Sequence, residues 1–365
     1  MDEYISSLSD EERAARRAQR AKARQAKLQA RRRAHMRRLL PVAAVLIALA
    51  AALAAFTSNK EASPKQGAIT PEQPVFSSRV PLPAAAPAAP YAALATESTI
   101  QLGDALSSAY AVVIDLQNDT ILAQKDAHTL ISPASMTKVL TLLVAAEQVA
   151  DKLDDTFTMT IDITDYCYVN DCSVVGLEIG ETVTVRELLY GTILPSGADA
   201  AVGLAVYVAG SHENFVAQMN EKAKELGLSD GAHFTNCVGL YNEAHKCTVY
   251  DMALIMKAAM DDPLCREVLK ARTYETVPTE YHPQGQVLSN WFLRRIEDRD
   301  NGGIQVIGAK TGYVVQSGSC AVSCGEDGDG RCYIVATGDA AGSWNCIYDH
   351  TLLYHDYCAK TDGAV

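Results

Sequence analysis

The sequence predicts an α/β fold of the α+β kind: one antiparallel sheet flanked by helices, with a mostly helical insert. The main observation is that strand-like segments occupy both ends of the folded part, whereas residues 140–270 have a helical pattern. Strands so far apart in the sequence must meet in one sheet, on which the helices pack. A second observation is an uncharged N-terminal stretch, which adds a transmembrane helix. The 365 residues suffice for one large or two modest domains.

The N-terminal region consists of three segments of different composition. Residues 1–38 form a basic tail with 12 Arg or Lys against 5 Asp or Glu, so +7 of the total −12 lies here and the remainder carries −19. Residues 39–56 are 18 uncharged residues that span about 27 Å as a helix, close to the hydrocarbon thickness of a bilayer. Residues 57–98 contain seven of the 13 prolines and predict a semi-extended linker. A folded domain is then expected over residues 99–360.

This organisation predicts a single-pass protein of the cell membrane with its folded domain outside the cytoplasm. The basic residues before the apolar segment 39–56 hold the N-terminus in the cytoplasm under the positive-inside rule. A cleaved signal peptide is the alternative, because small residues at 50–55 fit a cleavage site, and the domain would then be secreted. We interpret the tail as a solvated topogenic segment that can attract anionic lipid. No aromatic residues interleave with its arginines, so no nucleic-acid binding is expected.

All ten cysteines lie in the part that is expected to be exported. An even number of cysteines outside the cytosol favours disulfides, and Cys167/Cys172 and Cys324/Cys332 are close pairs, although the connectivity stays open. Zinc would need Cys-x-x-Cys knuckles, which are absent from the sequence. The remaining candidates, His350 and His355, do not share a helix face, so neither a metal nor a cofactor is expected.

The elements of the domain follow from periodicity and turn residues. A hairpin is expected around the turn at residues 117–119, and a helix opens near Ser135, just after Pro133. The expected strands are residues 110–116, 120–123, 303–309, 318–324 and 332–337, and further helices cover residues 188–209, 213–226 (with Gly227 as cap) and 344–358. The first hairpin and the last three strands share the sheet, with the active site between the sheet and the helical insert.

Two short motifs carry the chemistry. In Ser135-Met136-Thr137-Lys138, a helix places the serine and the lysine on one face, so the lysine can serve as the base that activates the hydroxyl. Burial and a second nearby cation would lower the pKa of that lysine, and Lys310 of Lys310-Thr311-Gly312 is the candidate cation. Either motif alone is common by chance. The two in this order are typical of β-lactamases and penicillin-binding proteins.

The chain resembles the serine-type D-Ala-D-Ala carboxypeptidases, the low-molecular-mass penicillin-binding proteins, over about residues 105–340. The stretch from Pro133 to Lys138 is similar to their active-serine signature, and Lys310-Thr311-Gly312-Tyr313 to their third motif. Between them, further matching segments are residues 194–200 (LPSGADA), 215–228, Phe234-Thr235-Asn236, His245 and Asp251-Met252-Ala253. This likeness implies a penicillin-binding-protein/β-lactamase-like fold.

The resemblance implies a role for each matching residue. Ser135 would be the acylated nucleophile, Lys138 its base, and Ser196 the relay of a proton to the leaving D-alanine. Lys310 and Thr311 would hold the terminal carboxylate, and the backbone N–H groups of Ser135 and Tyr313, the latter after Gly312, would form the oxyanion hole. His245 is expected to satisfy loop backbone groups rather than to touch a substrate.

One position departs from the family pattern. The second motif usually reads Ser-x-Asn, and here its third residue is Ala198, so an amide that would bond the substrate and Lys138 is missing. Such a loss costs about 1–3 kcal/mol and slows the enzyme without silencing it. The candidate replacements are a water molecule or a neighbour such as Asn220. The later Ser343-Trp344-Asn345 fits the same pattern, but we interpret it as the cap of the last helix.

The expected function is therefore an anchored carboxypeptidase that trims the last D-alanine from peptidoglycan stem peptides and binds β-lactams covalently. A β-lactamase of the same fold would need a deacylating glutamate, for which no convincing Glu-x-x-x-Asn occurs between the second and third motifs. Two rival functions stay open: a wall- or antibiotic-binding receptor without turnover, and an endopeptidase that cuts cross-links.

Overall fold

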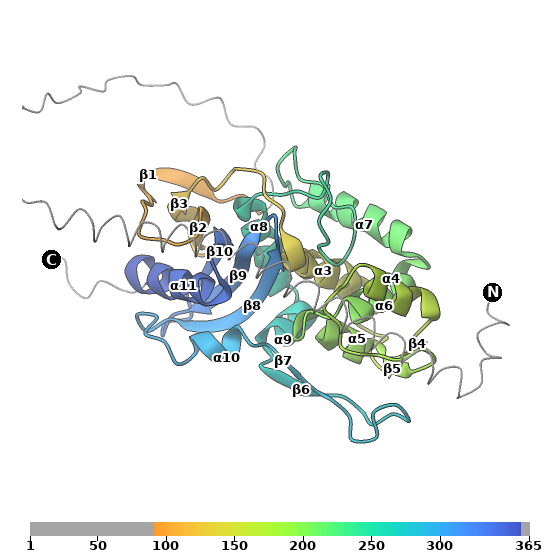
Figure 1. Ribbon diagram of the computed structural model, residues 1–365. Coiled ribbons are helices and arrows are strands. Elements are labelled where there is room, and N and C mark those ends of the chain that lie inside the picture. The colour runs from red at the N-terminus through yellow and green to blue at the C-terminus, as the bar shows by residue number, and fades with distance from the viewer. Residues whose placement is uncertain (1–90, 359–365) are drawn as a thin grey trace, which may run out of the picture. The chain divides into compact units, whose positions relative to one another are not determined.

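The computed structural model describes residues 91–358, which form the folded domain (Figure 1). The basic tail, the expected membrane segment 39–56 and most of the expected linker lie outside these residues. No helix within residues 91–358 is both long enough and apolar enough to cross a membrane.

The domain is built on a six-stranded sheet with the strand order β1-β3-β2-β10-β9-β8. All neighbouring strands are antiparallel except β1 and β3, which are parallel. The prediction that the first hairpin and the last three strands share one sheet is confirmed. The strands are β1 (Leu94–Gln101), β2 (Tyr110–Asp115), β3 (Thr120–Lys125), β8 (Gln305–Val314), β9 (Gly318–Glu326) and β10 (Cys332–Ala340).

Strand β1 spans the expected boundary between linker and domain at residues 98 and 99, and its exposed polar residues, which pair with β3, gave no hydrophobic signal. The strand expected to end at residue 309 continues to Val314, so Lys310 lies within β8 rather than after it. Because β8 is the last strand in the sheet order, the Lys-Thr-Gly motif lies on an edge strand.

Both faces of the sheet are covered, which explains the continuous apolar run of its central strands. Along β2, Val112 and Ile114 face the core shared with the helical insert, whereas Val113 faces a second core with the C-terminal helix. That second core is closed by α10 (Leu293–Ile296) and α11 (Ser343–Tyr357) on one side of the sheet (Figure 1). The cap of α11 is Gly342, so Ser343 is the first helical residue rather than the predicted cap.

On the other face, a bundle of helices surrounds α3 (Lys138–Val149), which begins directly after the short 3₁₀ helix η1 (Ala134–Thr137). Ten of the 12 residues of α3 are buried, so it is the central helix of the insert. The others are α4 (Ile161–Val169), α5 (Val185–Ile193), α6 (Ala198–Ala209), α7 (His212–Glu225), α8 (Val249–Asp261) and α9 (Pro263–Lys270). After α7, Gly227 adopts a φ of 71°, and Leu228 N–H bonds the Ala223 carbonyl, which confirms the predicted glycine cap.

The single helix predicted over residues 188–209 is wrong. It is two helices, α5 and α6, separated at Leu194-Pro195-Ser196-Gly197. Pro195 has no N–H to continue α5, and Ser196 turns the chain with a left-handed φ of 62°. Gly197 then caps α6, and no side chain would fit there, because a Cβ atom would lie 2.6 Å from Val175 Cγ2.

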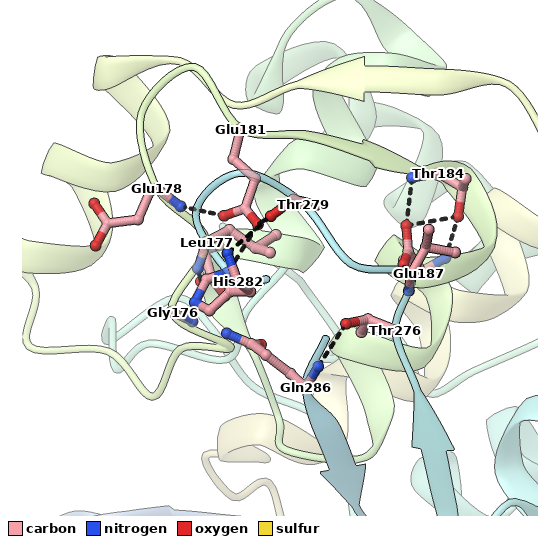
Figure 2. A network of polar contacts seen from close by, with 12 residues as sticks. Gly176, Leu177, Glu178, Glu181, Thr184, Glu187, Thr276, Thr279, His282 and Gln286 are labelled. Carbon is pink, nitrogen blue, oxygen red and sulfur yellow. Dashed lines mark hydrogen bonds and ion pairs between the residues drawn. The ribbon is translucent and has the colours of Figure 1, made fainter. Parts of the chain in front are cut away.

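A hairpin of β6 (Thr273–Glu275) and β7 (Val287–Ser289) projects from the domain and is tied to it by two buried glutamates (Figures 1 and 2). A small two-stranded sheet of β4 (Thr156–Thr158) and β5 (Thr182–Thr184) precedes α5. Glu187 closes a capping box with Thr184, the last residue of β5, and also accepts a 2.6 Å hydrogen bond from Val277 N–H. The other, Glu181, accepts bonds from Thr279 Oγ1 (2.7 Å) and Glu178 N–H (2.8 Å) and contacts His282 Nδ1 at 2.8 Å. The hairpin loop is therefore anchored to the loop before β5 through Glu181 and to the first turn of α5 through Glu187.

The expected disulfides are absent: all ten cysteines, which all fall within residues 91–358, are free thiols. Eight of them are buried, and residues such as Cys237 and Cys265 occupy separate places in the core as small apolar side chains. Cys167 and Cys172 lie close enough for each thiol to shift the pKa of the other, raising that of Cys167 and lowering that of Cys172. The pair Cys324/Cys332 does the same across β9 and β10.

Candidate active site

The structure brings Ser135 and Lys138 together at the junction of η1 and α3. Lys138 Nζ donates a 3.1 Å hydrogen bond to Ser135 Oγ and a second, of 2.8 Å, to the carbonyl of Val238. The same carbonyl is 3.4 Å from Ser135 Oγ. The preceding residue, Ala134, has a left-handed φ of 46°, which helps to turn the chain into η1. The hydroxyl and the amine are thus held against one fixed backbone oxygen.

Burial makes the Lys138 amine a usable base. Only 2% of this residue is exposed, and desolvation lowers its pKa from 10.5 to about 8. The nearby thiols of Cys172, Cys237 and Cys167 and the carboxylate of Asp199 act in the opposite direction and keep the pKa from falling further. A neutral amine at this distance can accept the proton of the serine hydroxyl.

The second lysine reaches the same region from the sheet. Lys310 Nζ on β8 donates a 2.9 Å hydrogen bond to Ser196 Oγ, at the break between α5 and α6, and a 2.8 Å bond to the Thr311 carbonyl. Burial, and next the positive charge of Lys138, hold the pKa of Lys310 well below its ordinary value. The left-handed backbone conformation of Ser196 places its hydroxyl within hydrogen-bond distance of Lys310 Nζ.

The rest of the third motif lies along β8. Gly312 packs so closely on the nucleophile that a Cβ atom there would lie 2.9 Å from Ser135 N and 2.8 Å from Cys320 Sγ. Only glycine lets this strand approach the backbone of Ser135. Thr311 is half-buried, whereas Tyr313 is 66% exposed. This close approach brings the backbone of Ser135 and the strand segment that contains Tyr313 together.

At the second motif, Asn220 does not take the place of the missing amide. Its side chain is fully engaged with backbone, donating to the carbonyls of Val216 and Phe234 and accepting from Phe234 N–H. The hypothesis that Asn220 substitutes for the amide is therefore wrong. Ala198 itself is buried at the start of α6, and its N–H bonds the Ser173 carbonyl at 2.8 Å.

A loop that the sequence reasoning did not single out for a role positions Lys138. The Oδ1 atom of Asn236 accepts three backbone N–H bonds, from Val238, Gly239 and Leu240, at 3.2, 2.7 and 2.9 Å. These bonds fix the Val238 carbonyl that receives the lysine. Gly239 allows the loop to touch η1, because a Cβ atom there would lie 1.9 Å from the Ala134 carbonyl oxygen. The signal was present in the match of Phe234-Thr235-Asn236.

Asp199 is a second buried residue without a predicted role. Its carboxylate accepts N–H bonds from Val175, Gly176 and Leu177 at 2.8, 2.8 and 3.1 Å, which ties the loop before β5 to the start of α6. The carboxylate also lies at the positive end of the α6 helix dipole. It therefore fixes the segment next to Ser196.

The histidines occupy structural positions. His245 Nδ1 accepts the Thr235 N–H at 3.0 Å, and its Nε2 lies 2.9 Å from Thr137 Oγ1, which agrees with the expectation of a loop histidine that satisfies its neighbours. Burial lowers its pKa to about 4, so it is neutral at neutral pH. His350 is buried between Ser323 and Thr337, while His355 is half exposed.

A serine hydroxyl lies beside one buried lysine, and a second lysine reaches the same region from the edge strand of the sheet. This arrangement has the form of a penicillin-binding-type serine acyl-transfer site. Residues 96–341 match the family model described as D-alanyl-D-alanine carboxypeptidase, and the chain belongs to that family.

Individual relatives agree with this assignment. The chain is 33% identical over 230 residues to D-alanyl-D-alanine carboxypeptidase DacF of Bacillus subtilis, which covers 62% of this chain and 56% of the relative. It is 32% identical over 255 residues to DacC of Escherichia coli, covering 67% and 60%. The chain thus spans less than two thirds of the length of these relatives.

Solved structures share the fold. The DD-transpeptidase of Streptomyces K15 superposes with a TM-score of 0.62 at 28% identity, covering 70% of this chain and 98% of that one. A D-alanyl-D-alanine carboxypeptidase from Mycobacterium tuberculosis gives a TM-score of 0.62 at 26% identity, covering 74% and 98%.

Proposed function

We propose that this protein is a serine-type D-Ala-D-Ala carboxypeptidase that removes the terminal D-alanine of peptidoglycan stem peptides and is acylated by β-lactams. The observation that carries the proposal is the 3.1 Å contact between a buried lysine of lowered pKa and the Ser135 hydroxyl. Membership of the carboxypeptidase family supports the same reaction.

The proposed reaction uses the residues in the following order. Ser135 Oγ attacks the carbonyl carbon of the penultimate D-alanine while its proton passes to Lys138 Nζ, and the N–H groups of Ser135 and Tyr313 receive the oxyanion. The peptide C–N bond breaks, and the leaving amine takes a proton through Ser196. Lys310, with Thr311, holds the terminal carboxylate. Water then hydrolyses the ester and regenerates the serine.

Two assays test this function. A fluorescent penicillin should label the wild-type protein covalently, and Ser135→Ala should abolish the label while leaving the far-UV circular dichroism unchanged. Incubation with a peptide ending in D-Ala-D-Ala should release free D-alanine. Peptide binding without D-alanine release would refute the enzyme and favour a receptor. Rapid penicillin turnover in place of a stable label would favour a β-lactamase.

A second candidate is transfer of the acyl group to an amine, because the Streptomyces K15 relative is named a DD-transpeptidase. The acyl-enzyme is the same in both reactions, and only the acceptor differs. Adding glycine or a D-amino acid to the D-alanine assay distinguishes them, since a transpeptidase yields an exchanged peptide at the expense of hydrolysis.

We also propose that residues 39–56 anchor the catalytic domain on the outer side of the cell membrane, with secretion after signal cleavage as the alternative. The charge step from +7 in residues 1–38 to −19 in the remainder supports this orientation. Membrane fractionation with added protease tests it: an anchored domain stays with the membrane and is digested from the outside, whereas a secreted one appears in the medium.

A further inference from the structure

Both tryptophans of the chain lie in one stack of aromatic and arginine side chains, on the face of the sheet opposite the helical insert. Trp291 lies just before α10 and Trp344 in the first turn of α11, two helices that contact each other (Figure 1). The stack, which we call the aromatic ridge, consists of Trp291, Arg295, Arg299, Trp344 and Tyr348. None of the catalytic roles proposed above uses it.

The aromatic ridge is continuous from α10 to α11. Arg295 Cζ lies 4.2 Å from the centre of the Trp291 ring and 4.9 Å from that of Trp344. Arg299 Cζ lies 5.5 Å from the Trp344 ring and 5.6 Å from the Tyr348 ring, and these two rings are 6.0 Å apart. Because each guanidinium is held over aromatic faces, it loses little conformational entropy when it donates to a ligand.

The rings of α11 remain open to solvent despite this stacking. Trp344 is 41% exposed and Tyr348 is 50% exposed. Apolar surface left in water costs about 25 cal/mol per Å², which a partner that covers the rings recovers. Trp, Tyr and Arg are also the residue types that contribute most binding energy at interfaces. The aromatic ridge therefore has the composition of a binding surface rather than of a solvated helix face.

The charge around the aromatic ridge favours a neutral partner. Residues 291–300 contain three Arg and three Asp or Glu, and residues 91–358 contain 36 Asp or Glu against 16 Lys or Arg. Anionic lipid or a phosphate polymer needs an excess of positive charge, which this surface lacks. A neutral partner rich in hydroxyl and amide groups can use the guanidinium donors together with the exposed carboxylates of Asp298 and Asp300.

The aromatic ridge belongs to the part of the domain that carries the catalytic edge strand. Helix α10 contacts β8 and is followed in sequence by that strand, on which Lys310 lies. In peptidoglycan, each stem peptide is attached to a chain of N-acetylated sugars. A surface on the same domain that holds this chain raises the effective concentration of stem peptides at Ser135 without any new contact at the active site.

We propose that the aromatic ridge binds the glycan strand of peptidoglycan, a neutral polymer of N-acetylated pyranose rings. The apolar C–H faces of the sugars lie against Trp344 and Tyr348, and Arg299 donates hydrogen bonds to the acetamide carbonyl oxygens. The saccharide chemistry rests on the aromatic ridge itself, whereas the assignment of this saccharide to peptidoglycan rests on the proposed function.

The first test measures saccharide binding without turnover. The full-length protein in detergent is titrated with tetra-N-acetylchitotetraose, which contains no peptide. Since both tryptophans belong to the aromatic ridge, the intrinsic tryptophan fluorescence reports on this surface directly, and we expect a saturable change. Tyr348→Ala keeps both tryptophans and should weaken binding about tenfold. Arg299→Gln, at another exposed position, is a second variant with the same expectation.

A matched control is Tyr241→Ala, which removes a tyrosine of similar exposure (45%) outside the aromatic ridge and should bind the saccharide as the wild type does. No fluorescence change, or an equal loss in Tyr241→Ala and Tyr348→Ala, overturns the proposal. Binding to phosphatidylglycerol vesicles instead of the saccharide also overturns it, in favour of a lipid surface.

The second test connects the aromatic ridge to the reaction. D-alanine release is measured from a soluble peptide ending in D-Ala-D-Ala and from isolated peptidoglycan. Tyr348→Ala should leave the rate with the soluble peptide unchanged and lower the rate with peptidoglycan about tenfold. Equal rates for wild type and variant with peptidoglycan overturn its role in substrate capture. Saccharide binding without D-alanine release from either substrate instead overturns the proposed function and leaves the saccharide site standing.

Discussion

The rate at which penicillin acylates Ser135 should rise with pH, because Lys138 must be neutral to accept the hydroxyl proton. Burial lowers the pKa of Lys138 to about 8. About a tenth of the molecules then have a neutral Lys138 near pH 7 and about nine tenths near pH 9, so the second-order acylation rate constant should increase about tenfold over this interval. An unperturbed lysine would remain almost fully protonated over the same range.

Stopped-flow measurement with a chromogenic β-lactam gives the profile directly. Lys138→Arg is the matched control, because a guanidinium keeps its charge and should give a slow, pH-independent rate. A wild-type profile that is flat between about pH 6 and pH 10, or one whose midpoint lies near the ordinary lysine value, would refute Lys138 as the base.

The same pKa shift predicts how stability depends on pH. Because the folded pKa is below the unfolded value of 10.5, the unfolded state binds more protons between about pH 8 and pH 10.5, so the free energy of unfolding rises with pH through that window. The contribution is about 3 kcal/mol. The stability difference between wild type and Lys138→Met should change by this amount across the window in urea unfolding, and a constant difference would contradict it.

Substitutions at three positions test the support of the site and of the hairpin. Asn236→Ala removes the acceptor of three backbone bonds and should cost about 1–3 kcal/mol of unfolding free energy and slow acylation, whereas Asn236→Asp, which keeps the acceptor, should restore most of the rate. Gly312→Ala pushes β8 from the nucleophile and should lower the acylation rate about a hundredfold; an unchanged rate would show that the close approach to Ser135 is dispensable. Glu187→Gln leaves one N–H or hydroxyl of the hairpin anchor unmatched and should lower the melting temperature by several degrees in calorimetry, with an unchanged melting temperature as the contrary result.

The parts of the fold that were predictable are those whose side chains are buried on a regular pattern. Strands such as β2 and β10 have both faces covered and therefore read as continuous apolar runs, and α3 contains the run 139–146, which only Thr141 interrupts. The exposed strand β1 has no such pattern, since its pairing with β3 uses backbone groups that any sequence provides. Backbone pairing at a sheet edge is decided by tertiary structure rather than by composition.

The site was predictable where two residue types at a fixed spacing define the chemistry, as with Ser135 and Lys138. The environment of those residues was not. The interruption between α5 and α6 had a sequence signal in Pro195 and Gly197, which the apolar pattern on either side outweighed, whereas the left-handed φ of Ser196 had none. The Asn236 loop contained a signal, the match of Phe234-Thr235-Asn236, but its role depends on the three backbone N–H groups that the Asn236 side chain gathers, which only the structure shows. Number and spacing of the cysteines predicted disulfides, and the two close pairs do come together, but all ten cysteines are free thiols.

The left-handed residues beside the reactive groups have a consequence for engineering. Ala134 and Ser196 each adopt a conformation that costs a non-glycine residue about 1–3 kcal/mol. Glycine would relax either position, but at 196 it would remove the hydroxyl that meets Lys310, and at 134 it would remove the methyl group packed against the glycine of the edge strand. Substitutions that raise the melting temperature should therefore be sought in the outer helices and loops, because the strained backbone at Ala134 and Ser196 is needed to position the reactive groups.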